Sequence, residues 1–252
     1  MTDTLATLQT TIPYNPLEDR RLPGVAPLDM EDWLIADEAF AGQMARRDRL
    51  LTTQPDTVRA LDRSAQAAAE EVLDMALAQA YPGAGVDVTR HDGIHVPIDR
   101  TDPLLTLGRL VQEDVCILQK QGDEHVLTGA VLCFPASWSL DEKFMRPLAR
   151  IHEPVDTYDT DMARRVQRLF DGVRPGRPLW RCNAIWYDDA ELHQPRREGV
   201  RRAAPSRDTA AFLRSERQCI LRLPETGAVV FSIHTYVVKN PHSQGIRRQV
   251  LI

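Results

Sequence analysis

The sequence lacks the features that identify membrane and secreted proteins. Its longest apolar runs, at residues 130–134 and 228–231, fall far short of the ~20 residues needed to cross a bilayer. The N-terminus, MTDTLATLQTT, lacks the basic segment followed by an apolar segment that is typical of a secretory signal. The four cysteines include no C-x-x-C pair that would indicate a zinc site or a dithiol. We therefore expect a cytoplasmic protein with free, buried thiols and no membrane partner.

Common nucleotide-binding and hydrolase motifs are also missing. The sequence has no G-x-G-x-x-G, no Walker loop and no G-x-S-x-G elbow, so it does not support a dinucleotide site, an NTPase or an α/β-hydrolase. It carries no flavin or iron–sulfur signature of its own. The composition is that of an ordinary globular protein, with 43% hydrophobic and 27% charged residues in 252. This length corresponds to one or two domains.

The net charge is −5, but the charged residues are distributed unevenly along the chain. Residues 1–140 carry 11 basic and 22 acidic side chains, whereas residues 141–222 carry 17 and 13. In the second segment 16 of the 17 cations are arginines, and they alternate with Asp and Glu. Arginine pairs with carboxylates or propionates in bidentate geometry, whereas a phosphate-tracking surface needs a continuous basic stripe. The pattern therefore argues against a nucleic-acid partner.

The first third of the chain predicts an arm and two helices. Four prolines within residues 1–27 indicate an extended arm. A helix capped by Asp29 should run to about residue 51, and a second should cover residues 57–80 and stop at Pro82-Gly83. The spacing of apolar residues then changes from helical to strand-like. VCILQK and HVLTGAVLCF predict two strands joined across Gly122-Asp123.

Helical signals return after Pro135. Ser139 and Glu142 match a capping box, and Pro147 should interrupt the following helix at Arg146. Residues 161–170 predict another helix, and three strands should follow at residues 178–187, 212–223 and 228–238. The Arg-rich stretch 188–208 between the first two of these strands is either a lid or a disordered loop.

This order of elements predicts an α+β fold. We expect a PAS-like five-stranded antiparallel sheet with helices packed on one face, plus an N-terminal helical extension. Residues 1–83 would form the arm and the extension, and residues 84–252 the PAS-like domain. Domains of this layout hold their ligands between the helical block and the sheet, so a cavity is expected there.

His152 is the histidine best placed for chemistry. It ends a helical segment whose apolar side chains can line a cavity, and Glu153-Pro154 follows it directly. A neutral imidazole in that setting suits haem iron, although a capped surface histidine is the common alternative. Arg146 and Arg150 lie four residues apart and share a helix face, where they could hold propionates or simply be solvated.

Two strands carry polar residues at alternating positions. In LWRCNAIWY, Arg181 and Asn183 share one face, and in FLRSERQCILRL, Glu216 and Arg222 share one face. Such residues can form a solvent-facing ladder of charges or the polar wall of a pocket. In a pocket, the carboxylate would bind an ammonium group, and an amide or guanidinium could polarise bound oxygen.

Four segments of the sequence together resemble a known family. They are VQEDVCILQ, LTGAVLCFPASWSLDEKFMRPLARIHEPV, PLWRCNAIWYDDAELHQP and LRSERQCILRLPETGAVVFSIHTYVV, and they span about half of the chain. The sequence resembles the haem-carrying alpha subunit of the haem-dependent oxidative N-demethylases. The resemblance implies a PAS-like fold that holds haem b and oxidises a small secondary amine, of the dimethylamine type, to the primary amine and formaldehyde. The resemblance also implies that oxygen is the oxidant of this reaction and that the electrons come from NADPH.

The resemblance also implies partners and residue roles. Flavin (FMN), a 2Fe-2S cluster and tetrahydrofolate are expected on partner subunits that supply electrons, not on this chain. His152, in the I-H-x-P-V run, would be the proximal haem ligand, with Arg146, Arg150 and Arg181 as further cofactor contacts. Glu216 would contact the substrate ammonium, with Glu198 as second choice. Arg222 and Asn183, with Arg181, would form the oxygen-binding wall.

Two other functions share the same expected fold. One is a haem-based gas or redox sensor, and the other is a haem-binding module without catalysis. A sensor should carry a signalling helix or an output domain after the last strand. Only about 14 residues follow Val238, which favours the enzyme.

Overall fold

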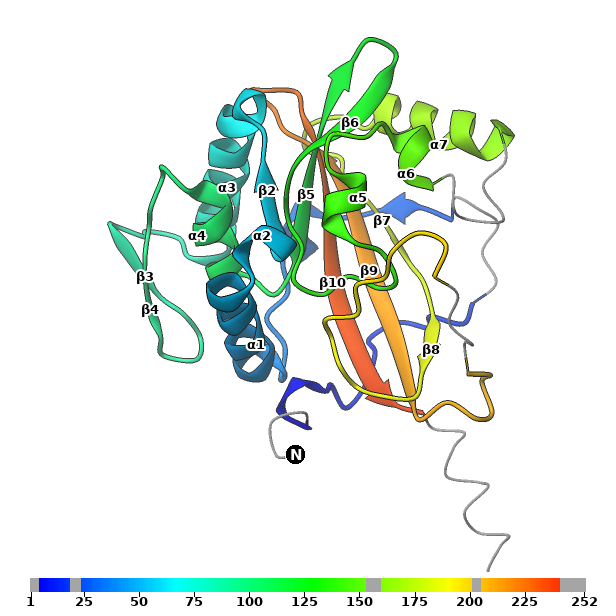
Figure 1. Ribbon diagram of the computed structural model, residues 1–252. Coiled ribbons are helices and arrows are strands. Elements are labelled where there is room, and N and C mark those ends of the chain that lie inside the picture. Colours follow the sequence, from blue (N-terminus) through cyan, green and yellow to red (C-terminus); the bar gives the residue numbers. More distant parts are fainter. Residues whose placement is uncertain (1–4, 19–23, 153–159, 201–204, 241–252) are drawn as a thin grey trace, which may run out of the picture.

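A computed structural model of the protein describes residues 5–18, 24–152, 160–200 and 205–240. A mostly antiparallel sheet of eight strands forms its centre (Figure 1), with the order β1-β7-β9-β10-β5-β6-β2 and with β8 paired to β9. The strands of this sheet are β1 (Ala26–Pro27), β2 (Arg59–Leu61), β5 (Asp114–Gln121), β6 (Glu124–Val131), β7 (Leu179–Cys182), β8 (Ile185–Tyr187), β9 (Phe212–Arg222) and β10 (Val229–Lys239). A separate two-stranded ribbon pairs β3 (Asp87–Thr89) with β4 (His95–Pro97).

The α+β class is confirmed, but the expected count of five strands is wrong. The five predicted strands correspond to β5, β6, β7 with β8, β9 and β10. The third is split because the chain departs from the ladder at Asn183 between β7 and β8. Two further strands come from the N-terminal region: β1 pairs with β7, and β2 pairs with β6. The N-terminal extension therefore contributes to the sheet as well as covering it.

Seven α-helices are present in the described residues. They are α1 (Phe40–Thr53), α2 (Pro55–Val58), α3 (Gln66–Ala80), α4 (Pro103–Leu110), α5 (Leu140–Lys143), α6 (Leu148–His152) and α7 (Thr160–Gly172). Short 3-10 turns occur at Leu5–Thr7, Met30–Asp32 and Arg63–Ala65. Within the described part of the chain, every helix is too short or too polar to span a bilayer.

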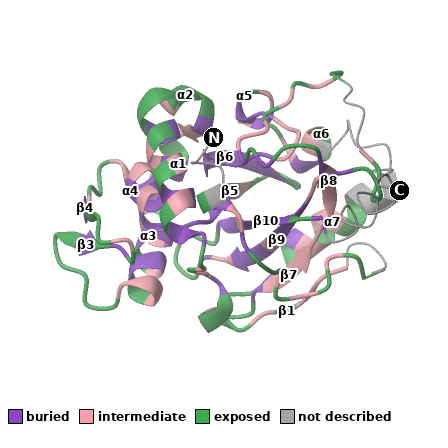
Figure 2. Ribbon diagram, turned by 90° about the horizontal axis from the view of Figure 1, so that it is seen from below, coloured by how far each residue is buried: buried purple, intermediate pink, exposed green. Residues whose placement is uncertain are grey.

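Helices cover both faces of the sheet, and each face has its own hydrophobic core (Figures 1 and 2). On one face, α1, α3 and α4 pack on Val115, Ile117 and Val131. On the other, α5, α6 and α7 pack around a second cluster that includes Leu118 and Ile220. Side chains alternate between the two faces along each strand, so β5 and β9 supply residues to both cores. Each fully buried aliphatic side chain contributes roughly 1.5–3 kcal/mol.

Both predicted N-terminal helices have different bounds in the structure. The first begins at Phe40, because Asp29 makes no side-chain capping bond and Met30–Asp32 form only a 3-10 turn. The second, expected over residues 57–80, is interrupted by β2 and resumes at Gln66. Between β4 and β5 the chain forms α4, which starts with Pro103 in its first turn, where the missing N–H costs nothing.

The N-terminal layer is joined to the sheet by a buried polar cluster around His234 on β10. The imidazole contacts the Glu113 carboxylate (Nδ1 to Oε1, 3.0 Å) and the Asp37 carboxylate (Nε2 to Oδ2, 3.1 Å). Burial opposes protonation of His234, but hydrogen bonds to Asp37 and Glu113 prevail and raise its pKa to about 9. Gln112 also donates to Asp37 (2.9 Å). This cluster lies on the opposite side of the sheet from α5, α6 and α7.

Candidate functional site

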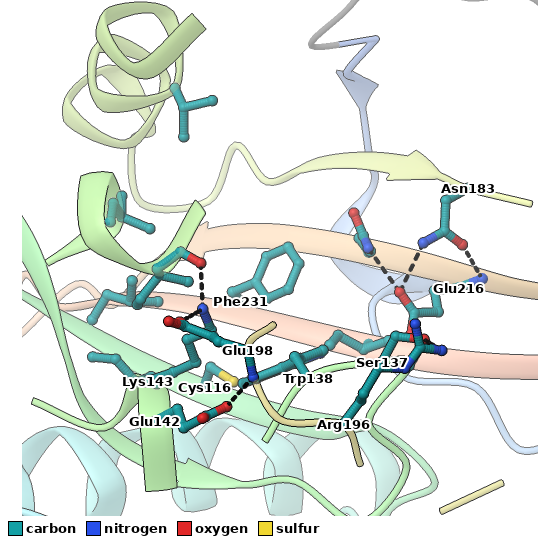
Figure 3. Close-up of a pocket in the computed structure, with 18 of the residues that line it drawn as sticks. Cys116, Ser137, Trp138, Glu142, Lys143, Asn183, Arg196, Glu198, Glu216 and Phe231 are labelled. Carbon is teal, nitrogen blue, oxygen red and sulfur yellow. Dashed lines mark hydrogen bonds and ion pairs between the residues drawn. The ribbon is translucent and has the colours of Figure 1, made fainter. Parts of the chain in front are cut away.

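A cavity of about 990 Å³ lies between the sheet and the layer of α5, α6 and α7, where the sequence predicted one. Residues 196–200, which follow β8, complete its wall. Figure 3 shows its labelled polar side chains in two groups, with Glu216 and Asn183 at one end and Lys143 and Glu198 at the other. Its volume is at the upper end of the roughly 300–1,000 Å³ typical of cofactor and ligand pockets.

Much of the cavity wall is apolar. Leu148 and Ile151 of α6 contribute to it, and the sheet supplies side chains on the matching face of its strands. In the ladder Phe231 on β10 is paired with Ile220 on β9 and with Cys116 on β5, so the three side chains point the same way. The remaining apolar residues are Leu118, Leu127, Ala136, Trp138, Val166, Leu169, Phe170, Ile185, Val200 and Ile233.

Glu216 on β9 is the centre of the polar end. Its side chain is only 5% exposed. Oε2 accepts hydrogen bonds from Asn183 Nδ2 (2.8 Å) and Gln218 Nε2 (3.0 Å), and Oε1 is 3.5 Å from Nη2 of the buried Arg214. The Glu216 backbone N–H donates to Asn183 Oδ1 (2.8 Å), so the Asn183 amide is fixed at both ends. We call Glu216, Asn183, Gln218 and Arg214 the Glu216 cluster.

Arg181 on β7 also lines the cavity at this end. Within the described residues no hydrogen-bond acceptor contacts its guanidinium, and its Nε is fully buried. Burial lowers the pKa of Arg181, while the charge of Glu216 acts in the opposite direction. Since a buried N–H without an acceptor carries a desolvation penalty, this half-buried guanidinium favours an anionic group of a bound ligand.

The second polar group surrounds Glu198. Its carboxylate accepts from Lys143 Nζ (2.6 Å) and from both terminal nitrogens of Arg150 (3.2 and 3.0 Å). Arg150 and Lys143 lower the pKa of the Glu198 carboxyl to about 2. Its backbone N–H donates to Glu142 Oε2 (2.9 Å). We call Glu198, Lys143, Arg150 and Glu142 the Glu198 cluster.

The capping box predicted at Ser139 and Glu142 does not form as expected. Ser139 makes no capping bond to the helix backbone, and its Oγ donates instead to Glu142 Oε2 (2.9 Å). Glu142 then accepts the Glu198 N–H rather than the backbone N–H of Ser139. The motif ties the described residues 188–200 of the stretch predicted as a lid or disordered loop to α5.

The structure brings some of the predicted site residues together and leaves others apart. Glu216, Asn183 and Arg181 line one end of the cavity, and Glu198 lines the other. The Arg222 guanidinium lies away from the cavity lining and donates to the carbonyls of Val173, Phe170 and Gly227 (2.6–2.7 Å). It therefore anchors the end of α7.

The predicted cofactor contacts near α6 are distributed differently. Arg150 is exposed and paired with Glu198, and Arg146 is exposed and outside the lining residues of the cavity. His152 is the last residue of α6, but its side chain lies outside the described residues. Its chain neighbour Ile151 lines the cavity, so the helix that carries His152 borders the cavity directly.

Sequence reasoning missed several lining residues. Ser137 lines the cavity with a left-handed backbone (φ 69°), its N–H donates to Gln194 O (3.0 Å), and its Oγ accepts from Arg196 (2.9 Å). A non-glycine residue in this conformation is uncommon and is maintained by its surroundings. No local signal identifies Ser137 or Arg196, because their proximity depends on residues 133–137 lying beside residues 193–196. Strand alternation places Gln218 on the face of β9 that carries Glu216, and the structure has it donating to that carboxylate.

The residues present fit a bound haem. The cavity is large enough, it is apolar beside the helix that ends in His152, and Arg181 offers at the polar end a half-buried guanidinium whose buried Nε has no acceptor in the described residues. An apolar surround with cationic contacts for two propionates is what a haem requires. No set of three or more His, Cys, Asp or Glu side chains in the described ranges could hold a metal ion alone.

Comparison with protein families agrees with this chemistry. A family described as haem-dependent oxidative N-demethylase, alpha subunit-like, matches residues 24–243. The match includes the whole central sheet, both helical layers and every lining residue of the cavity. The chain therefore belongs to the haem-dependent oxidative N-demethylase alpha subunit-like family.

Proposed function

We propose that this chain binds haem b in the cavity and catalyses oxidative N-demethylation of a small secondary amine of the dimethylamine type. The observation that supports it best is the Glu216 carboxylate, which is almost completely buried at one polar end of the cavity, beside its apolar wall. Its Oε1 has only a long 3.5 Å ion pair with Arg214, so this buried oxygen can still bind a cationic ligand such as an ammonium group. The products would be the primary amine and formaldehyde.

His152 is the proposed ligand of the haem iron, and Arg181 the proposed partner of a propionate. Both assignments follow from position, since α6 borders the apolar wall and Arg181 has no hydrogen-bond acceptor within the described residues. Arg150 and Arg146 are poorer candidates, because one is paired with Glu198 and the other is exposed outside the lining. When bound, the haem would supply the activation of oxygen.

Glu216 is the proposed contact of the substrate ammonium. Its Oε2 is committed to Asn183 and Gln218, whereas Oε1 has only a 3.5 Å contact with Arg214 and can accept a further N–H. The two amides hold the carboxylate in one orientation and would hold the amine in a fixed position. Arg222 has no part in this proposal, since its guanidinium is committed to the backbone around α7.

Two further parts of the proposal concern the fold and the electron supply. The central strands follow the order β7-β9-β10-β5-β6, with α5, α6, α7 and the cavity on one face, which supports a PAS-like domain. The family description, alpha subunit-like, supports partner subunits. Those partners would deliver NADPH-derived electrons through FMN and a 2Fe-2S cluster, and one would carry tetrahydrofolate to accept formaldehyde.

An optical titration tests the proposal. Haem-reconstituted protein should show a Soret band that shifts when dimethylamine is added, and it should form formaldehyde with oxygen and a chemical reductant. Glu216→Gln should retain haem but bind the amine about 10–150-fold more weakly, the equivalent of 1.5–3 kcal/mol for a hydrogen bond to a charged group. The matched control is Glu225→Gln, an exposed carboxylate outside the cavity, which should behave as wild type.

Each outcome separates the candidate functions. Absence of a Soret band would contradict haem binding, and a His152→Ala variant with an unchanged spectrum would contradict the ligand assignment. Haem binding without any response to amine and without formaldehyde would favour a sensor or a binding module. A Glu216→Gln variant with wild-type amine affinity would remove Glu216 from the substrate site.

A further inference from the structure

Lys143, at the end of α5, is a nearly buried lysine for which the proposed chemistry gives no role. The residue is only 4% exposed and lines the cavity. Its Nζ donates to two acceptors that are far apart in the sequence, the Ile151 carbonyl oxygen (2.8 Å) and Glu198 Oε1 (2.6 Å). A buried ammonium with two such partners is costly to desolvate and is therefore expected to fix a specific geometry.

The first acceptor lies in the last turn of the short helix α6. Carbonyls at a helix end have no partner within the helix, and a cation there interacts favourably with them. The Ile151 carbonyl belongs to the peptide group whose nitrogen is that of His152. Lys143 therefore fixes the peptide plane directly before His152, and with it the backbone that carries this residue.

The second acceptor connects the same lysine to the cavity wall after β8. Glu198 also pairs with Arg150, which lies on α6. The helix is thus attached to that wall twice, through Lys143 at its end and through Arg150 on its exposed side. Displacement of residues 196–200 would therefore also displace α6, and displacement of α6 would move this part of the cavity wall.

We propose that Lys143 is a positioning residue for His152 and that it couples the orientation of the proposed iron ligand to the cavity wall at Glu198. The inference rests on the proposed haem site. Lys143 acts through the Ile151 peptide and the Glu198 carboxylate, in the way that outer partners of metal-ligating histidines orient the imidazole.

The test uses the full-length chain and compares wild type, Lys143→Met, Lys143→Arg and the control Lys120→Met. Lys120 forms an exposed ion pair with Asp171 (2.6 Å) on the same side of the sheet and is outside the cavity lining. Haem affinity is measured by titration, axial ligation by absorption and electron paramagnetic resonance, and the midpoint potential by redox titration. Thermal melting followed by circular dichroism establishes that each variant is folded.

Lys143→Met should bind haem roughly 10–100-fold more weakly, as is typical when an outer partner of a metal ligand is removed. Its ferric spectrum should show more than one axial ligation state, and its midpoint potential should shift. Lys143→Arg should restore both properties, because a guanidinium can donate to both acceptors. Lys120→Met should match wild type in every spectrum.

Wild-type haem affinity, spectrum and midpoint potential in Lys143→Met would overturn the inference. If that variant does not fold, Lys143→Gln takes its place, since it is neutral and shorter, and an unchanged spectrum in it would overturn the inference equally. Failure of the haem site itself is distinguished by the other arms. In that case wild type binds no haem, or His152→Ala leaves the spectrum unchanged, and the role of Lys143 falls with it.

Discussion

The ionisation of His234 should control how firmly the N-terminal layer is held to the sheet. Burial opposes its protonation, but hydrogen bonds to Asp37 and Glu113 raise its pKa from 6.5 to about 9. Burial would raise the pKa of Asp37, but the hydrogen bond with His234 and those from Gln112 and Gln9 bring it to about 2. Asp37 therefore stays ionised over the whole range in which His234 titrates.

The magnitude and the pH range follow from that shift. A rise from 6.5 to about 9 corresponds to roughly 3 kcal/mol, at about 1.4 kcal/mol for each tenfold change in the proton affinity of the folded state. Because the folded pKa is raised, the stabilisation is complete below the unfolded value of 6.5 and declines as the pH rises, and it is lost once the pH exceeds about 9.

His234→Gln removes the titrating group and leaves two carboxylates without their cation. We expect its free energy of unfolding to be about 3 kcal/mol below that of wild type at pH 6, the lower end of the cost of breaking a buried ion pair. The deficit should shrink steadily between pH 7 and pH 9. Urea unfolding followed by tryptophan fluorescence measures it, and one of the four tryptophans, Trp33, donates to Ser232 (2.9 Å) on the same face.

His95→Gln is the matched control, since His95 is exposed on β4. It should stay within about 0.5 kcal/mol of wild type at every pH. A deficit for His234→Gln that is the same at pH 6 and pH 9 would refute the reasoning, because the stabilisation would then not depend on the imidazolium charge. A deficit below about 1 kcal/mol at pH 6 would refute the assigned magnitude.

Three further predictions concern the opposite face and the core. Burial lowers the pKa of His125, whose Nδ1 is 2.9 Å from Gln167 Nε2. Wild type should therefore lose stability as the pH falls below 6.5, and urea unfolding of His125→Gln should not show that loss. Arg222→Met should cost about 1–3 kcal/mol by leaving three carbonyls unpaired, with faster amide exchange at the end of α7. Gly108→Ala would place a Cβ 2.6 Å from Val131 Cγ2, and should cost about 1–3 kcal/mol in the same unfolding assay.

Strand alternation predicted the polar end of the cavity well. It placed Arg181 with Asn183 and placed Glu216 on the matching face of β9, and the structure has all three lining the same cavity. The same alternation failed for Arg222, which has the right parity but lies at the end of β9, beneath the end of α7. Parity gives the face of a strand and says nothing about what covers that face at each point along it.

The helical layers were predictable only where local signals agreed with tertiary structure. α7 lies within one or two residues of its expected bounds, because its apolar face and its end at Gly172 are local features. Residues 59–61 have helical neighbours on both sides but pair with β6, since tertiary pairing overrides a weak helical preference there. The Glu198 cluster was unpredictable, because it joins residues about 50 positions apart in the chain.

Strand β9 explains how one sheet can serve two separate purposes. Arg214, Glu216 and Gln218 are the members of the Glu216 cluster that β9 supplies to the cavity face. Between them, Ser215 and Arg217 point the other way, where Ser215 contacts Tyr14 of the N-terminal arm and Arg217 donates to the carbonyls of residues 32 and 33. Substitutions on the first face should therefore alter ligand binding, and those on the second should alter stability. Because successive side chains point to opposite faces, the charged residues of β9 are shared between the site and the N-terminal layer.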